Sequence, residues 1–305
     1  MIGSRDVIVE EVGFRSAGAK ISARLYRLSS APGLLPGIVH SNGFMGVQDA
    51  IVPAYAQAFA EAGYASLTFD YRGFGLSEGG PALSPLEQVR DLRNALTYLE
   101  SREEVDAGRI GIFGDAATGG GNACQVAAID ARVRCLVTVT AMGDGDAWLR
   151  AMRTPERWAA LQERLARDRL RRVRSGRSEG LQPIGEVLIP SEERRRAVAE
   201  GHFQPVGARL PEQMTMEEVE ELMAFKPVDH VHRISPRAAM WMCYDSDPVA
   251  PSSAAEEMYE RAGEPKRLVY LRTSTHYYRH TQGFHEVTSN ALDWFEHHLR
   301  GGTGG

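Results

Sequence analysis

The sequence predicts an α/β protein with a mostly parallel central sheet, helices on both faces of the sheet and a helical cap inserted late in the sheet. Three observations support this prediction. Short β-branched and apolar runs alternate with longer amphipathic segments, which is typical of strands joined by crossover helices. The alternation stops at about residue 146 and resumes at about residue 237. The chain has 305 residues, enough for one domain of roughly 200 residues and an insertion of about 90.

The first half of the chain begins with two strands, at 7–10 and 19–25, that are expected to pair antiparallel. Gly63 ends the first expected helix, and Pro85 favours a helix start at that position. After the first pair, strands are expected at 37–40, 65–70, 109–113 and 134–140, with helices at 49–62, 85–102 and 119–129. A strand followed by a crossover helix, repeated in this way, builds a parallel sheet.

The second half divides into an insertion and a return to the strand rhythm. In the insertion, helices are expected at 158–174, 191–200 and 216–224, and prolines separate them. Beyond it come a strand at 239–244, a helix at 253–262, a strand at 267–271 and a closing helix that ends at about 299. We therefore divide the chain into a first core part (1–145), a helical lid (146–236) and a second core part (237–305). The lid leaves and rejoins the sheet near its carboxyl edge, so it is expected to cover a site there.

Composition excludes several classes of protein. The net charge is -5, with 40 acidic against 35 basic residues, which argues against nucleic acid as a partner. Three cysteines do not make a disulfide framework, and the chain shows neither a signal peptide nor an apolar run of the roughly 18 residues that a membrane helix needs. We predict a cytoplasmic enzyme that acts on a small molecule and needs no metal or cofactor. A homodimer is compatible with the sequence.

Residues 110–120 carry the most specific local signal. A nucleophile elbow is a tight strand-to-helix turn that needs small residues two positions before and two positions after its apex. Gly114 and Thr118 meet this requirement when Ala116 is the apex. Alanine, however, has no atom that can attack a carbonyl group.

Neighbouring residues are weaker candidates for a nucleophile. An apex at Asp115 puts Phe113 where a small residue is needed, and an apex at Thr118 moves the turn into the helix. Cys124 lies about two helical turns farther on. The same stretch is also compatible with an ordinary glycine-rich turn that binds an anion at the helix N-terminus.

Two further residues are expected to reach the same edge of the sheet. Asp247 follows one predicted strand, and His276 follows the next. One helix and one strand separate them, so both are expected at the carboxyl edge, where the elbow also lies. The chain order elbow, acid, histidine is that of an α/β-hydrolase triad, in which the carboxylate orients the histidine and the histidine moves the proton.

A candidate oxyanion hole follows the first buried strand, in the segment 40–46. Gly43 lets the backbone approach a developing negative charge closely. The expected donors are the backbone N–H groups of Phe44 and Ala117, the residue after the apex. The alternative is that the glycines of this segment only form a turn.

Together these segments resemble the α/β-hydrolase superfamily, in particular bacterial members related to dienelactone hydrolases and to the S15 group of peptidases and esterases. The resemblance rests on 40–46, 70–77, 114–120, 247–251 and His276, which span the chain outside the insertion. It implies an α/β-hydrolase fold with a catalytic serine at the position of Ala116. It also implies that 70–75 is the structural D-x-R-G-x-G turn of the superfamily, in which we expect Asp70 to pair with Arg72.

The alanine at 116 has two explanations. One is an engineered Ser→Ala change in a hydrolase of esters, lactones, thioesters or activated amides, which leaves Asp247 and His276 in place. The other is a natural loss of the nucleophile, in a protein that binds a ligand or uses the same two residues for proton-transfer, lyase or isomerase chemistry. The first is favoured, because a protein without the hydrolase reaction has no evident need for both residues.

The acyl substrate is expected to lie under the lid. Gly43, Met45, Met142, Asp144, Trp148 and Tyr277 are the candidate contacts. Other apolar side chains of the insertion are available as well, although most are expected in its own core: Trp158, Phe203, Met214, Met216, Met223 and Phe225. The arginine-rich segment 164–174 is expected to be a solvated helix face over the site; binding an anionic substrate group is the lesser alternative.

Overall fold

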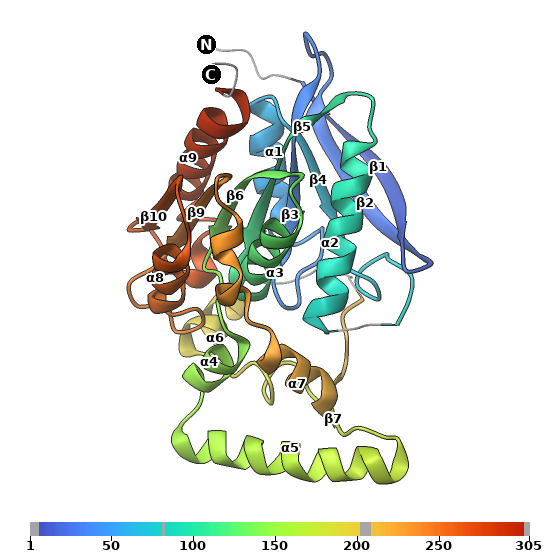
Figure 1. The fold of residues 1–305 in the computed structure, drawn as a ribbon, viewed down its shortest axis with the longest axis vertical. Coiled ribbons are helices and arrows are strands. Elements are labelled where there is room, and N and C mark those ends of the chain that lie inside the picture. Colours follow the sequence, from blue (N-terminus) through green and yellow to red (C-terminus); the bar gives the residue numbers. More distant parts are fainter. Residues whose placement is uncertain (1–5, 81–82, 202–208, 302–305) are drawn as a thin grey trace.

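The protein is built around one eight-stranded sheet, seen in a computed structural model that describes residues 6–80, 83–201 and 209–301 (Figure 1). The strand order is β1-β2-β4-β3-β5-β6-β9-β10. β1 and β2 pair antiparallel, β2 is antiparallel to β4, and all the remaining pairs are parallel. The strands are β1 (Val7–Ser16), β2 (Ala19–Leu28), β3 (Leu35–Ser41), β4 (Ala65–Phe69), β5 (Val105–Asp115), β6 (Val133–Val139), β9 (Ala238–Cys243) and β10 (Lys266–Tyr270).

The central strands are buried from end to end. Every residue of β3, β4 and β9 is buried, as expected for parallel strands that helices cover on both faces. One face packs against α2 (Pro85–Glu100), α3 (Ala116–Ile129) and α8 (Ser252–Arg261), and the other against α1 (Val52–Glu61) and α9 (Phe284–Phe295). The parallel strands therefore all direct their carboxyl ends to one edge, where the loops of the site lie.

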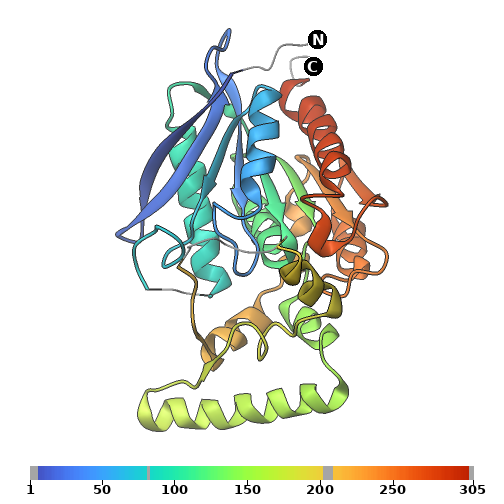
Figure 2. The same ribbon diagram turned by 180° about the vertical axis from the view of Figure 1, so that it is seen from behind.

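The segment between β6 and β9 forms a separate layer beyond that edge. It contains α4 (Gly145–Ala151), α5 (Pro155–Ser175), β7 (Gly180–Leu181), α6 (Glu192–Ala199), β8 (Met214–Thr215) and α7 (Met216–Ala224), followed by the short 3₁₀ turns η1 (Pro227–Asp229) and η2 (Val231–Arg233). Figures 1 and 2 both show α5 lying across the end of the molecule, farthest from the sheet. Within the described ranges, no helix is long and apolar enough to cross a membrane.

The predicted fold class is confirmed. Each strand and helix expected from the sequence is present, with ends that differ by a few residues. One local expectation was wrong, because Asp70 and Arg72 do not pair. Asp70 accepts hydrogen bonds from the backbone N–H groups of Gln48 (2.8 Å) and Leu76 (3.0 Å). Arg72 instead pairs with Asp91 of α2, at 2.7 Å, because the turn directs the two side chains to different neighbours.

Candidate active site

The turn from β5 into α3 has the geometry of an elbow. Ala116 stands at its apex with φ of 64°, in the left-handed region that is unfavourable for residues other than glycine. A Cβ atom at Gly114 would lie 2.7 Å from that of Ala123, and one at Gly43 would lie 2.8 Å from that of Ala116. The two glycines are therefore required by close approach, and the strained apex points to a functional turn.

His276 and Asp247 form a hydrogen-bonded pair at the same edge. His276 opens the 3₁₀ turn η3 (His276–Tyr278) after β10, and its Nδ1 lies 2.7 Å from Oδ2 of Asp247. The other oxygen of Asp247, Oδ1, accepts from the N–H groups of Val249 (2.7 Å) and Ala250 (2.8 Å). Burial opposes ionisation of Asp247, but His276 and these two N–H groups outweigh it and hold its pKa below the usual value. An ionised Asp247 leaves Nε2 as the imidazole atom available to a substrate.

Two backbone N–H groups beside the apex have no acceptor among the described residues. Within the described ranges, neither the N–H of Phe44 nor that of Ala117 donates a hydrogen bond to a protein group. Phe44 follows Gly43, the residue in contact with Ala116, and Ala117 is the first residue after the apex. Both residues line the same cavity as Ala116. Buried N–H groups without a partner are rare in proteins, and here they are free to bind an oxygen atom of a ligand.

The cavity has a volume of about 350 Å³ and joins the elbow, the histidine loop and the insertion. Ala116 and His276 both line it, and so do four of the predicted substrate contacts: Gly43, Met45, Trp148 and Tyr277. Trp148 of α4 is fixed by two contacts. Its Nε1 donates to the carbonyl of Val249 at 2.6 Å, and its ring lies edge-on to Phe44 with centroids 6.0 Å apart. The insertion therefore contacts both the loop that carries Asp247 and the segment 40–46.

Two predicted contacts lie elsewhere, and this corrects the sequence analysis. Met142 is buried in the core, where its side chain packs against Gly121 of α3. Asp144 caps α4 by accepting from the N–H of Ala147 (3.1 Å), and it pairs with Lys226 at 2.7 Å. Neither lines the cavity. Phe203, also considered as a contact, lies outside the described residues.

None of the alternative nucleophiles, Asp115, Thr118 and Cys124, presents an unbound oxygen or sulfur atom to the cavity. Both carboxylate oxygens of Asp115 are bound by Arg279. Thr118 and Cys124 are buried in α3 and do not line the cavity. Burial also raises the pKa of the Cys124 thiol to about 12, which keeps it protonated.

Sequence reasoning missed several residues of the cavity. Arg279 lies three residues after His276, and it carries a charge into the site that no motif predicted. Ile184, Leu188 and Arg194 come from the insertion, where neither helical periodicity nor chain order indicates which side faces the sheet.

The insertion also holds the histidine loop directly. Oε1 of Glu193, in α6, accepts from Oγ1 of Thr275 at 2.6 Å and from the N–H of Tyr277 at 2.9 Å. These two residues flank His276 on either side. A shift of α6 would therefore move the backbone on both sides of His276.

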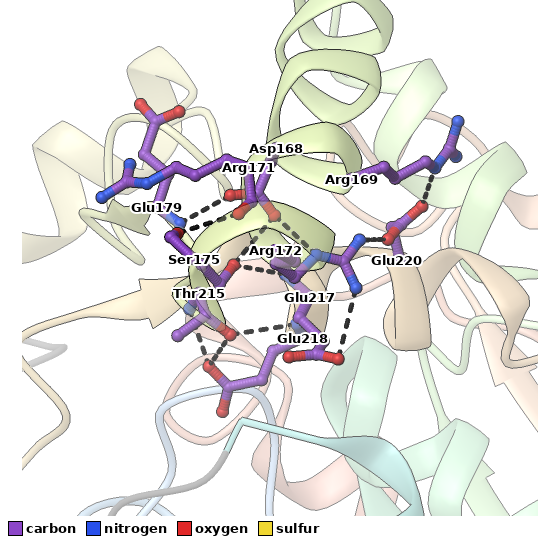
Figure 3. A network of polar contacts seen from close by, with 11 residues as sticks. Asp168, Arg169, Arg171, Arg172, Ser175, Glu179, Thr215, Glu217, Glu218 and Glu220 are labelled. Atoms are coloured by element: carbon purple, nitrogen blue, oxygen red, sulfur yellow. Dashed lines mark hydrogen bonds and ion pairs between the residues drawn. The ribbon is translucent and has the colours of Figure 1, made fainter.

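The arginine-rich helix α5 does not lie over the site, which is a second correction. No described residue of α5 lines the cavity. Four of its arginines pair instead with acidic residues of the insertion: Arg164, Arg167, Arg169 and Arg172. Figure 3 shows Arg169 and Arg172 beside Glu220. Arg172 also binds Asp168 (2.9 Å) and Glu217 (3.2 Å). These contacts join α5 to α7, so the role of Arg172 is structural.

Comparison with known proteins identifies the family. The model of the X-Pro dipeptidyl-peptidase (S15) family matches residues 17–278. The chain belongs to this family. Among curated relatives, quorum-quenching protein AidA of Acinetobacter baumannii is 30% identical and covers 79% of this chain and 80% of its own. Thiohydrolase aneE of Aspergillus aculeatus is 27% identical and covers 85% of this chain and 83% of its own.

Solved structures share the fold of this S15-family chain. A hypothetical protein of Pseudomonas aeruginosa superposes with a TM-score of 0.81 at 25% identity, over 96% of this chain and 94% of the other. The α/β-hydrolase GrgF of Penicillium superposes with a TM-score of 0.77 at 24% identity, over 96% and 99%. The S15 resemblance recognised from the motifs is thus confirmed by the family match, and the α/β-hydrolase fold by the solved structures. The family and the names of the relatives support a hydrolase-type activity.

Proposed function

We propose that this S15-family chain carries the active site of an acyl hydrolase, with Ala116 in the position of the nucleophile. The observation that carries the proposal is the strained apex at Ala116, with φ of 64°, in one cavity with His276. A strained turn is kept where the surrounding structure and a function require it. The bond between His276 and Asp247 supplies the orientation that a general base needs.

The mechanism is that of a serine hydrolase with serine at position 116. The serine Oγ forms a bond to the carbonyl carbon of an ester, lactone, thioester or activated amide, and its proton passes to Nε2 of His276. The N–H groups of Phe44 and Ala117 bind the oxyanion of the tetrahedral intermediate. His276 then returns the proton to the leaving group, and water releases the acyl group by the reverse sequence. With alanine at 116 the first bond cannot form.

The direct test is Ala116→Ser, assayed on small aryl esters, thioesters and lactones. We expect turnover at least about 10³-fold above that of the alanine chain, because only the nucleophile is missing. Covalent labelling by a fluorophosphonate should appear with the serine and be absent with alanine. Adding His276→Ala should abolish both. A folded Ala116→Ser protein that neither reacts with the label nor turns over any of the three classes would refute the proposal.

Position 116 itself has a separate test. We infer that alanine replaces an original serine, since the acid, the histidine and both oxyanion N–H groups are all in place. The intact mass of the native gene product should then exceed that of this chain by one oxygen atom. Equal masses would favour a natural protein that binds its ligand without covalent chemistry. Proton exchange catalysed by the alanine chain, and lost with His276→Ala, would indicate lyase or isomerase chemistry instead.

A further inference from the structure

Arg279 and Asp115 form a buried ion pair between the elbow and the histidine loop. Asp115 is the last residue of β5, directly before the apex, and Arg279 directly follows η3. Nε of Arg279 lies 2.7 Å from Oδ1 of Asp115, and Nη2 lies 2.5 Å from Oδ2. The two side chains are 1% and 3% exposed. This is the bidentate arrangement in which a planar guanidinium fixes both the distance and the orientation of a carboxylate.

The same arginine binds two further parts of the chain. Its third nitrogen, Nη1, donates to the backbone carbonyl of His276. Its own carbonyl accepts from the hydroxyl of Tyr55 in α1, at 3.0 Å. One side chain therefore joins the residue before the apex to the main chain of the histidine, while its backbone is held from α1.

Stability alone gives no reason for this pair. Removing two charges from water is unfavourable for each ion, and apolar residues of similar volume often stabilise a fold equally well or better. An apolar pair would fill the same space but would not fix the separation of residues 115 and 276. A lysine would bind one oxygen at a time and would leave the orientation free.

We infer that Arg279 and Asp115 are positioning residues, which hold the main chain of His276 at the distance from position 116 that proton transfer requires. They act through His276 and do not take part in the bond changes. The inference rests on the proposed function, because only a nucleophile at 116 gives this distance a catalytic meaning.

The kinetic test uses Ala116→Ser as the parent. We expect Arg279→Lys and Asp115→Asn each to lower kcat by up to about 10²-fold, the loss expected of a misplacement near 1 Å, with KM changed less than about threefold. The double variant should lose little more than either single variant, because the pair acts as a unit. Additive losses, or a loss confined to KM, would contradict the inference.

Two controls separate positioning from stability. Arg72→Lys disturbs another buried pair, with Asp91, whose side chains are 11% and 2% exposed and do not line the cavity; it should lower the melting temperature and leave kcat unchanged. Asp115→Leu combined with Arg279→Met replaces the charges with apolar groups, so the fold should be retained while kcat stays low. If this apolar double variant regained both stability and the kcat of the parent, the pair would only support the fold.

A measurement on the alanine chain is independent of hydrolysis. The ¹⁵N resonances of the His276 imidazole report its hydrogen bond to Asp247. Arg279→Lys should shift them, and Arg72→Lys should leave them unchanged. If Ala116→Ser proves inactive, the proposed function fails, while this experiment still tests whether the Arg279–Asp115 pair positions His276. Unchanged His276 resonances in Arg279→Lys would overturn the positioning role.

Discussion

Arginine is used in opposite ways at the sheet edge and in the insertion. At the edge, Arg279 is 1% exposed and binds Asp115 in a closed, bidentate pair. In the insertion, Arg172 is 21% exposed and binds three acidic residues of α5 and α7. Water screens the contacts of Arg172 with Glu217 and Glu220, which are 58% and 23% exposed, and is excluded from the Arg279–Asp115 pair, so similar contacts differ in strength. The difference teaches that an arginine count carries little information until burial is known.

The largest expected effect is the loss of one partner of the buried pair. Asp115→Ala leaves the guanidinium of Arg279 in the interior without its counter-ion, so the free energy of unfolding should fall by about 3–5 kcal/mol. Urea unfolding followed by circular dichroism measures it. The matched lid variant, Glu217→Ala, should cost less than about 1 kcal/mol, because Glu217 is 58% exposed. Equal losses of unfolding free energy in Asp115→Ala and Glu217→Ala would show that burial does not distinguish the two sets of ion pairs.

The second expected effect is a pH dependence that arises in the core. His40 is fully buried beside Phe59 and Phe113, and burial lowers its pKa to about 3, against 6.5 in the unfolded chain. Below pH 6.5 the unfolded chain therefore binds a proton that the folded chain does not, so stability falls as the pH falls from 6.5 toward 3. Over the first two pH units the loss is about 2 kcal/mol.

The His40 effect is measured as a difference between variants. Urea unfolding across this pH range should show a flatter dependence for His40→Gln than for the parent. His232→Gln, which changes an exposed histidine of the insertion, should leave the parent dependence unaltered. The same slope in all three proteins would show that His40 does not titrate in this way.

The smallest expected effect is in the arginine network of the insertion. Arg172→Ala should lower the free energy of unfolding by about 0.5–1 kcal/mol. Glu217 and Glu220 are partly exposed, and the buried Asp168 keeps its hydrogen bonds from Oγ of Ser178 and the N–H of Glu179. The loss should shrink in 1 M salt, where the Debye length falls to about 3 Å. Arg167→Ala, whose side chain is 68% exposed and 3.8 Å from Glu163, serves as the control and should change almost nothing. A loss independent of salt would place the Arg172 network among the buried pairs.

The fold and the order of the site residues were predictable because they depend on local signals. The strand rhythm predicted β3 to β6, β9 and β10, and the spacing from Asp247 to His276 implied one shared edge. Which residues of the insertion and of the segment after β6 line the cavity was less predictable. Met142 and Asp144 follow β6, as expected, but core packing against α3 and capping of α4 direct their side chains away from the cavity.

The sequence by itself determined the sheet, the elbow and the absence of a nucleophile at Ala116, because each follows from residue types at short, fixed spacing. Only the tertiary structure decided which charges are buried. Arg279 and Asp115 are 164 residues apart in the chain, and Arg172 lies in a more obvious basic cluster. A pairing over such a distance leaves no periodic or local pattern, because it is set by how the sheet brings the ends of β5 and β10 to one edge.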